Sequence, residues 1–336
     1  MPDANSLYGP LDPAPDAGWA DAGPRMGFFT DTSVCIGCKA CEVACKEWNA
    51  VPDSGFDLLG MSYDNTGALT ANSWRHVAFI EQPRPAGHRT PPFAGSPTGA
   101  PATGDDTPPS APTSGNDTPP PGGANGSQFL GMPGSQPPGR GTGADGRADF
   151  RWLMMSDVCK HCTHAACLDV CPTGALFRTE FGTVVVQEDI CNGCGYCISA
   201  CPYGVIDQRK GDGRAWKCTL CYDRLGAGQT PACAQACPTE SIQYGPLDEL
   251  RERAAQRVAT LHERGVPEAR LYGHDPTDGV GGDGAFFLLL DEPEVYGLPP
   301  DPVVTTRDLP KMYKRAGLAA LAMVAAAVAA FVGGSS

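Results

Sequence analysis

The chain has 336 residues, of which 41% are hydrophobic, so it is long enough for one large domain or two ordinary domains with a buried core. Its 42 glycines and 33 prolines exceed the usual share, which indicates that one long stretch is of low complexity. The formal net charge of -13, without any cluster of Lys and Arg, excludes a surface that binds nucleic acid.

Sixteen cysteines fall into four groups of four, with none left over for a disulfide. Thiolates that hold metal must stay reduced while the site assembles, which favours folding in the cytoplasm. Residues 1–25 are acidic and rich in Pro, Ala and Gly, which predicts a flexible N-terminal tail. This tail resembles neither a Sec signal peptide nor a twin-arginine signal.

We expect folded sequence to begin near Met26, where Gly27-Phe28-Phe29 is typical of a short apolar strand. A second strand is predicted from Trp74 to Ile80. From residue 83 to residue 147 the composition changes, because 29 of these 65 residues are Pro or Gly. Such a segment cannot bury a core, so 83–147 is predicted to be a disordered, solvent-exposed insertion, with a docking tether as the alternative.

Ordered sequence is expected to resume at Phe150-Arg151-Trp152, ahead of the other three cysteine groups. Periodicity and composition predict four further elements: a strand at Thr183 to Val186, a helix at Asp248 to Arg264, a buried strand at Ala285 to Leu290, and a Pro-rich connector at Asp291 to Pro302. The glycines from Gly279 to Gly284 match G-x-G-x-x-G by letter. They precede a strand rather than a helix, so we interpret them as a glycine turn and not as a nucleotide site.

The C-terminal stretch Ala316 to Val332 has no charge and would span about 26 Å as a helix. We predict a single membrane span whose alanine-rich surface packs against membrane helices of a partner, with a buried helix of a soluble complex as the alternative. Lys311, Lys314 and Arg315 precede the span and no charge follows it. By the positive-inside rule, the cysteine-rich part then faces the cytoplasm.

The spacing of the cysteines indicates their chemistry. The first group is Cys35, Cys38, Cys41 and Cys45, and the third is Cys191, Cys194, Cys197 and Cys201, both with the spacing C-x2-C-x2-C-x3-C. This is the run of bacterial two-cluster ferredoxins, in which the fourth thiolate binds the other cluster. The second group is Cys159, Cys162, Cys167 and Cys171, and the fourth is Cys218, Cys221, Cys233 and Cys237; both widen one interval and keep the final C-x3-C.

Zinc is the main alternative occupant. Zinc sites made of four cysteines use two separated C-x2-C pairs, whereas two groups here are tight triplets, so the spacing favours [4Fe-4S] clusters. His161 and His164 lie within the second group, but every quartet is already complete in cysteine. Seven cations near the motifs could raise cluster potentials or be plain surface charge: Lys39, Lys46, Lys160, Arg209, Lys210, Arg214 and Lys217.

With these motifs the chain resembles the iron-sulfur (beta) subunit of membrane-associated formate dehydrogenases, within the four-cluster electron-transfer subunits of molybdopterin oxidoreductases. The resemblance rests on VCIGCKACEVACKEWN (34–49), CKHCTHAACLDVCPTGAL (159–176), CNGCGYCISACPYGVI (191–206), KCTLCYDRLGAGQTPACAQACPTESIQYG (217–245) and FFLLLDEPEVYGLP (286–299). It covers the chain except the first 25 residues and the insertion.

The resemblance implies four [4Fe-4S] clusters, each held by three cysteines of one motif and the last cysteine of another. The implied sets are set a (Cys35, Cys38, Cys41, Cys237), set b (Cys218, Cys221, Cys233, Cys45), set c (Cys159, Cys162, Cys167, Cys201) and set d (Cys191, Cys194, Cys197, Cys171). It also implies two partners, a molybdopterin or tungstopterin subunit that oxidises formate and a quinone-reactive integral membrane subunit. Well-studied respiratory members lie on the periplasmic side by co-export with a twin-arginine partner, which is the alternative to the cytoplasmic side.

We therefore expect an α+β protein with two ferredoxin-like modules that carries electrons and catalyses nothing alone. The expected parts are a tail (1–25), a first module (26–82 and 207–246), the insertion (83–147), a second module (148–206), a segment that docks on partners (247–310) and a membrane anchor (311–336). The alternatives are the same electron-transfer role in a dimethyl sulfoxide, tetrathionate or polysulfide reductase or a hydrogenase, a zinc-stabilised scaffold, and an iron-sulfur redox sensor. A sensor is disfavoured because the chain has no DNA-binding motif.

Overall fold

The computed structural model describes residues 12–55, 63–64, 66–83, 150–304, 306 and 309–333. By contacts the chain divides into two compact units, residues 1–82 with 152–336, and residues 83–151. The predicted insertion at 83–147 lies outside the described residues except for its first residue. Everything below concerns the described part, which has mixed helix and strand content, as the sequence predicts.

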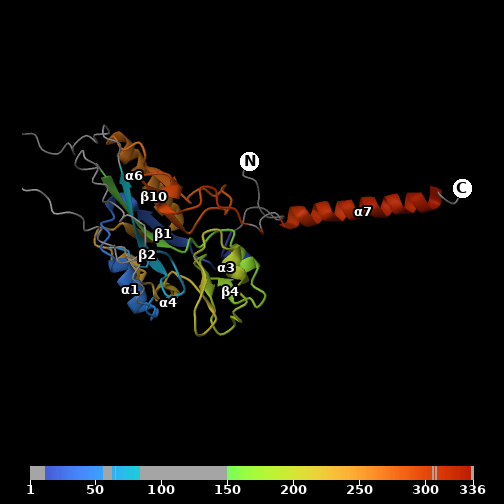
Figure 1. Cartoon of the computed structure of the whole chain (residues 1–336), viewed down its shortest axis with the longest axis horizontal. Helices are drawn as coiled ribbons and strands as arrows, with labels where there is room; N and C mark the ends of the chain where they lie inside the picture. The colour runs from blue at the N-terminus through green and yellow to red at the C-terminus, as the bar shows by residue number, and fades with distance from the viewer. Residues whose placement is uncertain are drawn as a thin grey trace, which may run out of the picture. The chain divides into compact units, whose positions relative to one another are not determined.

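A four-stranded sheet organises the first unit, in the order β8-β1-β10-β9. Strand β1 (Met26–Asp31) pairs antiparallel with β8 (Ile242–Pro246) and parallel with β10 (Ala285–Leu289), and β10 pairs antiparallel with β9 (Arg270–Tyr272). The sheet therefore joins the first cysteine motif to segments more than two hundred residues away in sequence, and Figure 1 draws β1 beside β10. The predicted strands at 27–29 and 285–290 are confirmed.

The two faces of this sheet have different neighbours, because successive side chains of a strand point to opposite sides. Phe29 and Phe286 stack on one face with ring centroids 5.3 Å apart, and α6 (Leu247–Glu263) covers them with Leu247, Leu250, Ala254 and Leu261. Phe28 and Phe287 lie on the other face, in the cluster of buried residues that contains most of the cysteines. The cysteine loops therefore pack against this second face of the sheet.

The segment at 247–310 contributes to the fold itself. Strand β10 is an inner strand of the sheet with all five residues buried, and α6 covers one sheet face. Docking of this segment on partner subunits stays a prediction. The predicted helix at 248–264 is confirmed as α6. The predicted connector at 291–302 contains a short 3-10 helix, η3 (Pro293–Tyr296). The apolar run of β10 is long enough to form a core strand, so the segment belongs to the fold itself.

The remaining elements are short and surround the cysteine motifs: η1 (Pro15–Ala17), η2 (Thr32–Val34), α1 (Ala40–Trp48), β2 (Arg75–Pro83), β3 (Phe150–Val158), α2 (Ala166–Asp169), β4 (Leu176–Arg178), β5 (Val184–Val186), α3 (Tyr196–Ala200), β6 (Asp207–Gln208), β7 (Ala215–Trp216), α4 (Tyr222–Gly226) and α5 (Ala232–Gln235). Three two-stranded sheets pair β2 with β3, β4 with β5, and β6 with β7. Helix α1 packs against α5, and α2 packs against α3. The first motif therefore adjoins the fourth, and the second adjoins the third.

The second half of the predicted tail, residues 12–25, has defined contacts. The indole Nε1 of Trp19 donates to the carbonyl of Arg178 at 2.9 Å, and Arg25 donates to Thr163 Oγ1 at 2.6 Å and to the carbonyl of His161 at 2.9 Å. An aromatic and a guanidinium side chain in an otherwise polar stretch provide these contacts. Residues 12–25 therefore contact the folded part through these side chains, and residues 1–11 lie outside the described part.

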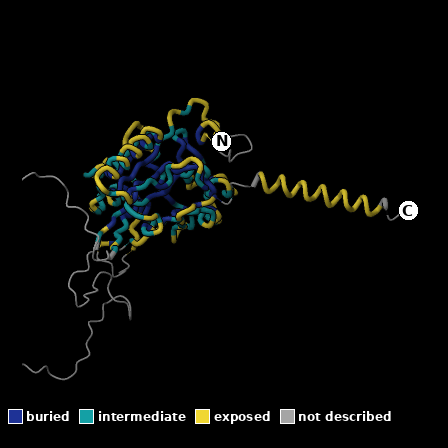
Figure 2. The backbone as a smooth tube through the Cα atoms, turned by 90° about the horizontal axis from the view of Figure 1, so that it is seen from above, coloured by how far each residue is buried: buried dark blue, intermediate teal, exposed yellow. Residues whose placement is uncertain are grey.

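Helix α7 (Leu309–Gly333) is longer than the predicted span at 316–332, because Lys311, Lys314 and Arg315 belong to the same helix. Residues Lys311–Phe331, with a mean hydropathy of 1.6, are long and apolar enough to cross a membrane, at about 1.5 Å per residue. Figure 2 draws this helix as exposed along its length, and Phe331 is 85% exposed. Large apolar side chains this exposed need a covering of lipid or protein.

Candidate metal centres

All sixteen cysteines are free thiols, so none is used in a disulfide. They lie on tight loops that lead into short helices, and residues with positive φ make these loops turn. Gly37 is one of them, with φ of 65°; a Cβ on it would lie 2.6 Å from the ring of Phe79. Gly193 has the same place in the third motif, where a Cβ would lie 2.3 Å from the carbonyl oxygen of Gly213. Only glycine fits at these two positions.

One cavity lies within the second motif. Its sulfur-bearing lining residues are Cys159, Cys162, Cys167 and Cys201, the last of which comes from the third motif. The rest of the lining is mainly apolar, with two cations, Lys160 and Lys217. The cavity and its mouth hold about 340 Å³ of space. The structure therefore brings together three cysteines of one motif and the terminal cysteine of another.

A second cavity lies at the first motif and has the same arrangement. It is lined by Cys35, Cys38, Cys41 and Cys237, the last of which comes from the fourth motif. The cavity and its mouth hold about 290 Å³ of space. Hydroxyl side chains of Ser156, Thr239 and Ser241 line its wall, so this site offers hydrogen-bond donors to sulfur.

The other eight cysteines are grouped by their mutual electrostatic influence. Burial, with the sulfurs of Cys218, Cys233 and Cys221, raises the pKa of Cys45 well above its ordinary value. The amide of Asn49 lies 3.8 Å from Cys45 Sγ and 3.7 Å from Cys221 Sγ. These four cysteines therefore share one neighbourhood.

The third motif provides the last neighbourhood. Burial, with the sulfurs of Cys191, Cys171 and Cys194, raises the pKa of Cys197 to about 11. The backbone amide of Ala215 donates to Cys191 Sγ at 3.5 Å. Cys171 comes from the second motif, so cysteines of motifs two and three lie close together in this neighbourhood as well.

The residues fit iron-sulfur clusters better than a single ion. No group of three or more His, Cys, Asp or Glu side chains in the described part of the chain is placed to hold one metal ion. In a four-cysteine zinc site the sulfurs converge on one ion at about 2.3 Å, whereas the thiolates of a [4Fe-4S] cluster bind separate irons and stand apart. Backbone amides also donate to sulfur, for example Leu220 to Cys218 at 3.3 Å. Donors of this kind stabilise anionic clusters.

The two histidines of the second motif contact the backbone of other segments. His161 is buried, and its Nδ1 accepts from the backbone amide of Val184 at 3.1 Å. Burial and nearby cations, Lys217 foremost, lower the pKa of His161 well below its ordinary value, so its ring is neutral. The backbone amide of His164 donates to the carbonyl of Val280 at 2.8 Å. The glycine turn at 279–284 therefore braces the second motif, and it runs into β10 rather than a helix.

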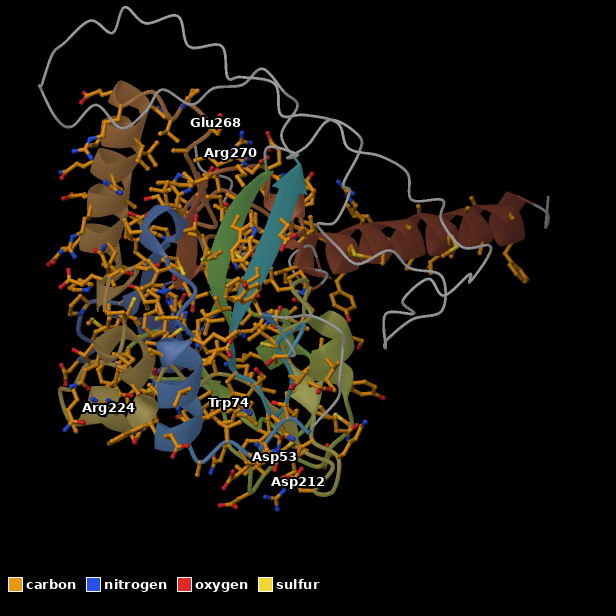
Figure 3. The ribbon with its side chains drawn as sticks, turned by 60° about the vertical axis from the view of Figure 1, so that its left-hand side comes forward. Asp53, Trp74, Asp212, Arg224, Glu268 and Arg270 are labelled. Atoms are coloured by element: carbon orange, nitrogen blue, oxygen red, sulfur yellow. The ribbon has the colours of Figure 1, made fainter. Side chains whose placement is uncertain are left out.

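The seven cations near the motifs divide into two kinds. Lys160 and Lys217 are buried; Lys160 pairs with Asp157, and Lys217 donates to the carbonyl of Cys218 at 2.9 Å. The others lie at least partly in solvent. Arg209, for instance, stacks on the ring of Trp216 at 3.7 Å, and Trp216 stacks in turn on Trp74. The indole Nε1 of Trp216 donates to Asp212 Oδ1 at 3.3 Å, and Figure 3 labels Trp74 and Asp212.

Sequence reasoning missed Arg75, which is 2% exposed on β2. Its Nη2 donates to Cys233 Sγ at 3.2 Å, and its Nη1 donates to the carbonyl of Ser156 at 3.2 Å. Burial opposes its charge, but the sulfurs of Cys233 and Cys41 outweigh burial and raise its pKa. The only available signal was an arginine among apolar residues of a predicted strand.

Comparison with known proteins shows the family of the chain. Residues 150–247 match the family model described as a 4Fe-4S dicluster domain. The nitrate-inducible formate dehydrogenase iron-sulfur subunit of Escherichia coli is 35% identical over 280 residues, 82% of this chain and 73% of the relative. The formate dehydrogenase iron-sulfur subunit of Haemophilus influenzae is 34% identical over 88% of this chain and 74% of the relative. A subunit of the anaerobic dimethyl sulfoxide reductase of Escherichia coli is 46% identical over 70% of this chain and 80% of the relative.

Proposed function

The chain belongs to the family of iron-sulfur subunits that includes those of formate dehydrogenases, and on that premise we propose that it relays electrons from a formate-oxidising subunit to a quinone-reactive membrane subunit. Its role is electron transfer and its cofactors are [4Fe-4S] clusters. Such clusters, when bound, exchange one electron at a time. The formate-oxidising partner would carry molybdopterin or tungstopterin.

We assign one cluster to each of sets a, b, c and d. The observation that carries this assignment is the pair of cavities, one lined by the four cysteines of set a and the other by the four of set c. The mutual influence of Cys45 with Cys218, and of Cys197 with Cys171, supports sets b and d. The assignment also predicts two ferredoxin-like modules, and the packing of α1 on α5 and of α2 on α3 supports them.

The order of the four sets follows from their shared neighbours. Sets a and b are linked because Arg75 reaches the sulfurs of both. Burial, followed by the sulfur of Cys159 in set c, raises the pKa of Cys218 in set b to about 12, so sets b and c are neighbours. Sets c and d exchange their terminal cysteines. We therefore propose the linear order a, b, c, d, in which sets a and d are the ends that face the two partners.

Helix α7 is the proposed membrane anchor. Its apolar length and exposed side chains support an anchor, and its small residues suit packing on membrane helices of a partner. Lys311, Lys314 and Arg315 at its N-terminal end support a cytoplasmic position for the cluster domain. The alternative is the outer face of the membrane, reached by co-export with a partner.

A second candidate function is the same relay in a dimethyl sulfoxide reductase. The 46% identity to the reductase subunit of Escherichia coli favours it. Formate is preferred because the formate dehydrogenase subunits align with 82% and 88% of this chain, against 70% for the reductase subunit.

The decisive experiment is low-temperature EPR of membranes that contain the tagged chain with its native neighbours. Spectra are recorded before and after formate, with dithionite as the full-reduction control and a Cys221→Ser variant as the matched control. Formate-dependent cluster signals that change in the Cys221→Ser variant support the formate relay. If only dithionite produces the signals, and dimethyl sulfoxide then removes them, the donor assignment is wrong and the reductase function replaces it.

A further inference from the structure

Arg75 lies at the junction of sets a and b, although no cysteine motif contains it. One arm of its guanidinium, Nη2, donates to Cys233 Sγ of set b at 3.2 Å. The other arm, Nη1, lies 3.3 Å from Ser156 Oγ, which itself lies 3.2 Å from Cys41 Sγ of set a. A thiolate that binds iron has no proton, so the Ser156 hydroxyl donates to Cys41 and accepts from Arg75. One cation thus reaches both sets.

The charge of Arg75 has no carboxylate to balance it. In the described part of the chain its guanidinium makes no ion pair with Asp or Glu, and its Nε has no hydrogen-bond partner. The face of the guanidinium lies over the ring of Phe28, with 4.9 Å from Cζ to the centroid. A buried charge is costly unless an opposite charge compensates it. The compensating groups here are sulfurs, those of Cys233, Cys41, Cys218 and Cys45.

We propose that Arg75 is a shared positioning residue that raises the reduction potentials of the clusters in sets a and b together. The inference rests on the proposed function, because it requires clusters in both sets. Reduction adds one electron, and so one negative charge, to a cluster that is already anionic. A fixed cation and its hydrogen bonds favour that reduced form. Arg75 keeps its proton throughout, so each step moves one electron and no proton.

The planar fork of arginine suits this role better than lysine. Its two terminal nitrogens have a fixed separation, so they donate hydrogen bonds to Cys233 and Ser156 at the same time, whereas an ammonium group is a single point charge. The cation also offsets the repulsion between two neighbouring clusters when both are reduced. A relay gains from this effect, because adjacent clusters can then hold electrons at similar potentials.

The test is an EPR-monitored redox titration of the purified complex that contains the full chain. The Arg75→Gln variant is expected to lower two of the four midpoint potentials and to leave the other two unchanged. The expected change in the oxidised-to-reduced ratio is at least about tenfold, which equals 59 mV for a one-electron couple. Arg75→Lys should restore part of the shift. Signals are assigned to sets a and b by their loss in Cys38→Ser and Cys221→Ser variants.

Arg224→Gln is the matched control. Arg224 is also a buried arginine, located between Cys221 and Cys233 and labelled in Figure 3. Its guanidinium bonds to the carbonyl of Thr230 and the side chain of Gln235 rather than to sulfur. Its replacement should leave all four potentials in place. Equal shifts in the Arg75→Gln and Arg224→Gln variants would overturn the inference, because any lost charge would then have the same effect.

Ser156→Ala separates the contact of Arg75 with Cys41, which runs through Ser156, from its direct contact with Cys233. This variant is also informative if Arg75→Gln fails to load iron. It removes only the hydroxyl that links Arg75 to Cys41, so the set a potential should fall and the set b potential should stay. An unchanged set a potential in the iron-loaded Ser156→Ala variant, or four unchanged potentials in an iron-loaded Arg75→Gln variant, overturns the proposal and leaves the relay intact. If the wild-type protein gives fewer than four cluster signals, the cluster assignment itself is wrong.

Discussion

The inner and outer cysteine sets differ in their exposure. All four cysteines of set b are buried, and no cysteine of set c is exposed. Set a contains one exposed cysteine, Cys38, and set d contains one, Cys194. The proposed order puts sets b and c in the middle of the relay and sets a and d at its ends. The fold therefore shields the cysteines of sets b and c from solvent, and it exposes one cysteine in each of sets a and d.

The surroundings of the sets differ in the same way. Two buried cations lie toward the middle of the order, Arg75 between sets a and b and Lys217 beside set c, where they balance anionic sulfur. Exposed apolar side chains lie beside the outer sets, with Ile36 at 58% next to set a and Tyr196 at 60% next to set d. Exposed apolar groups of this kind mark surfaces that other proteins cover. Buried cations therefore lie toward the middle of the proposed order, and each end has an exposed apolar side chain available for contact.

The largest effect on electron transfer is expected when the cluster of set b or set c is lost. Cys233→Ser should remove the cluster of set b, about four irons per molecule, and abolish electron transfer between the ends. It should also loosen the fold, because Cys233 and Cys45 belong to the main buried core. Cys194→Ser is the control at an end, which should lose about four irons and keep the other three signals. Iron analysis, EPR and protease resistance measure the difference, and equal loss of structure in both variants would contradict the distinction.

A charge in the anchor tests whether the cluster sets depend on the membrane. Val324 is 61% exposed in α7, and Val324→Arg should cost about 2.5–3.5 kcal/mol of insertion at the helix centre. The protein should move from the membrane to the soluble fraction, with Val324→Ala as the control that stays. All four EPR signals should persist in both variants. Loss of the signals on release would mean that the membrane, and not the fold, supports the sets.

The motif spacing indicated which cysteines form the candidate site, and the family resemblance suggested how they group. The ligands follow each other in short loops, so the local C-x2-C spacing carried the information, and the strands at 27–29 and 285–290 were evident as apolar runs. The neighbours of the motifs were not predictable in this way. Arg75 meets Cys233 across 158 residues, and the pairing of β1 with β10 joins segments with no shared pattern. Contacts of this kind arise from tertiary packing alone.

The tail and the glycine turn illustrate the same limit. Composition predicted a flexible tail, and it gave no sign that Trp19 bonds to Arg178 or that Arg25 bonds to Thr163 of the second motif. The turn at 279–284 runs into strand β10, as its position in the sequence predicts. Its bracing of the second motif depends on backbone bonds that no residue type specifies.

A smaller effect is expected from a substitution in the four-stranded sheet, on which the cysteine loops pack. Phe28 is fully buried between Arg75 and Tyr244, so Phe28→Ala should cost about 3–5 kcal/mol of unfolding free energy. Denaturation followed by loss of visible cluster absorbance measures this cost. Phe28→Leu, which keeps most of the apolar volume, is the control and should cost less. A cost below about 1 kcal/mol for Phe28→Ala would show that the sheet does not support the inner sets.

The smallest effect on stability is expected at an end. Tyr196→Ala next to set d should change the unfolding free energy by no more than about 0.5 kcal/mol, because the side chain is exposed. It should nevertheless weaken association with the partner at that end, measured by co-purification of the complex subunits. Undiminished association in the Tyr196→Ala variant would remove the contact role of this surface.

The most direct test of the account is iron-edge anomalous scattering from crystals of the complex. The account predicts four groups of iron, with Cys237 at the group of Cys35, Cys45 at the group of Cys218, Cys201 at the group of Cys159, and Cys171 at the group of Cys191. A group of iron bound by all four cysteines of one motif, or a single zinc ion in place of any group, would contradict it.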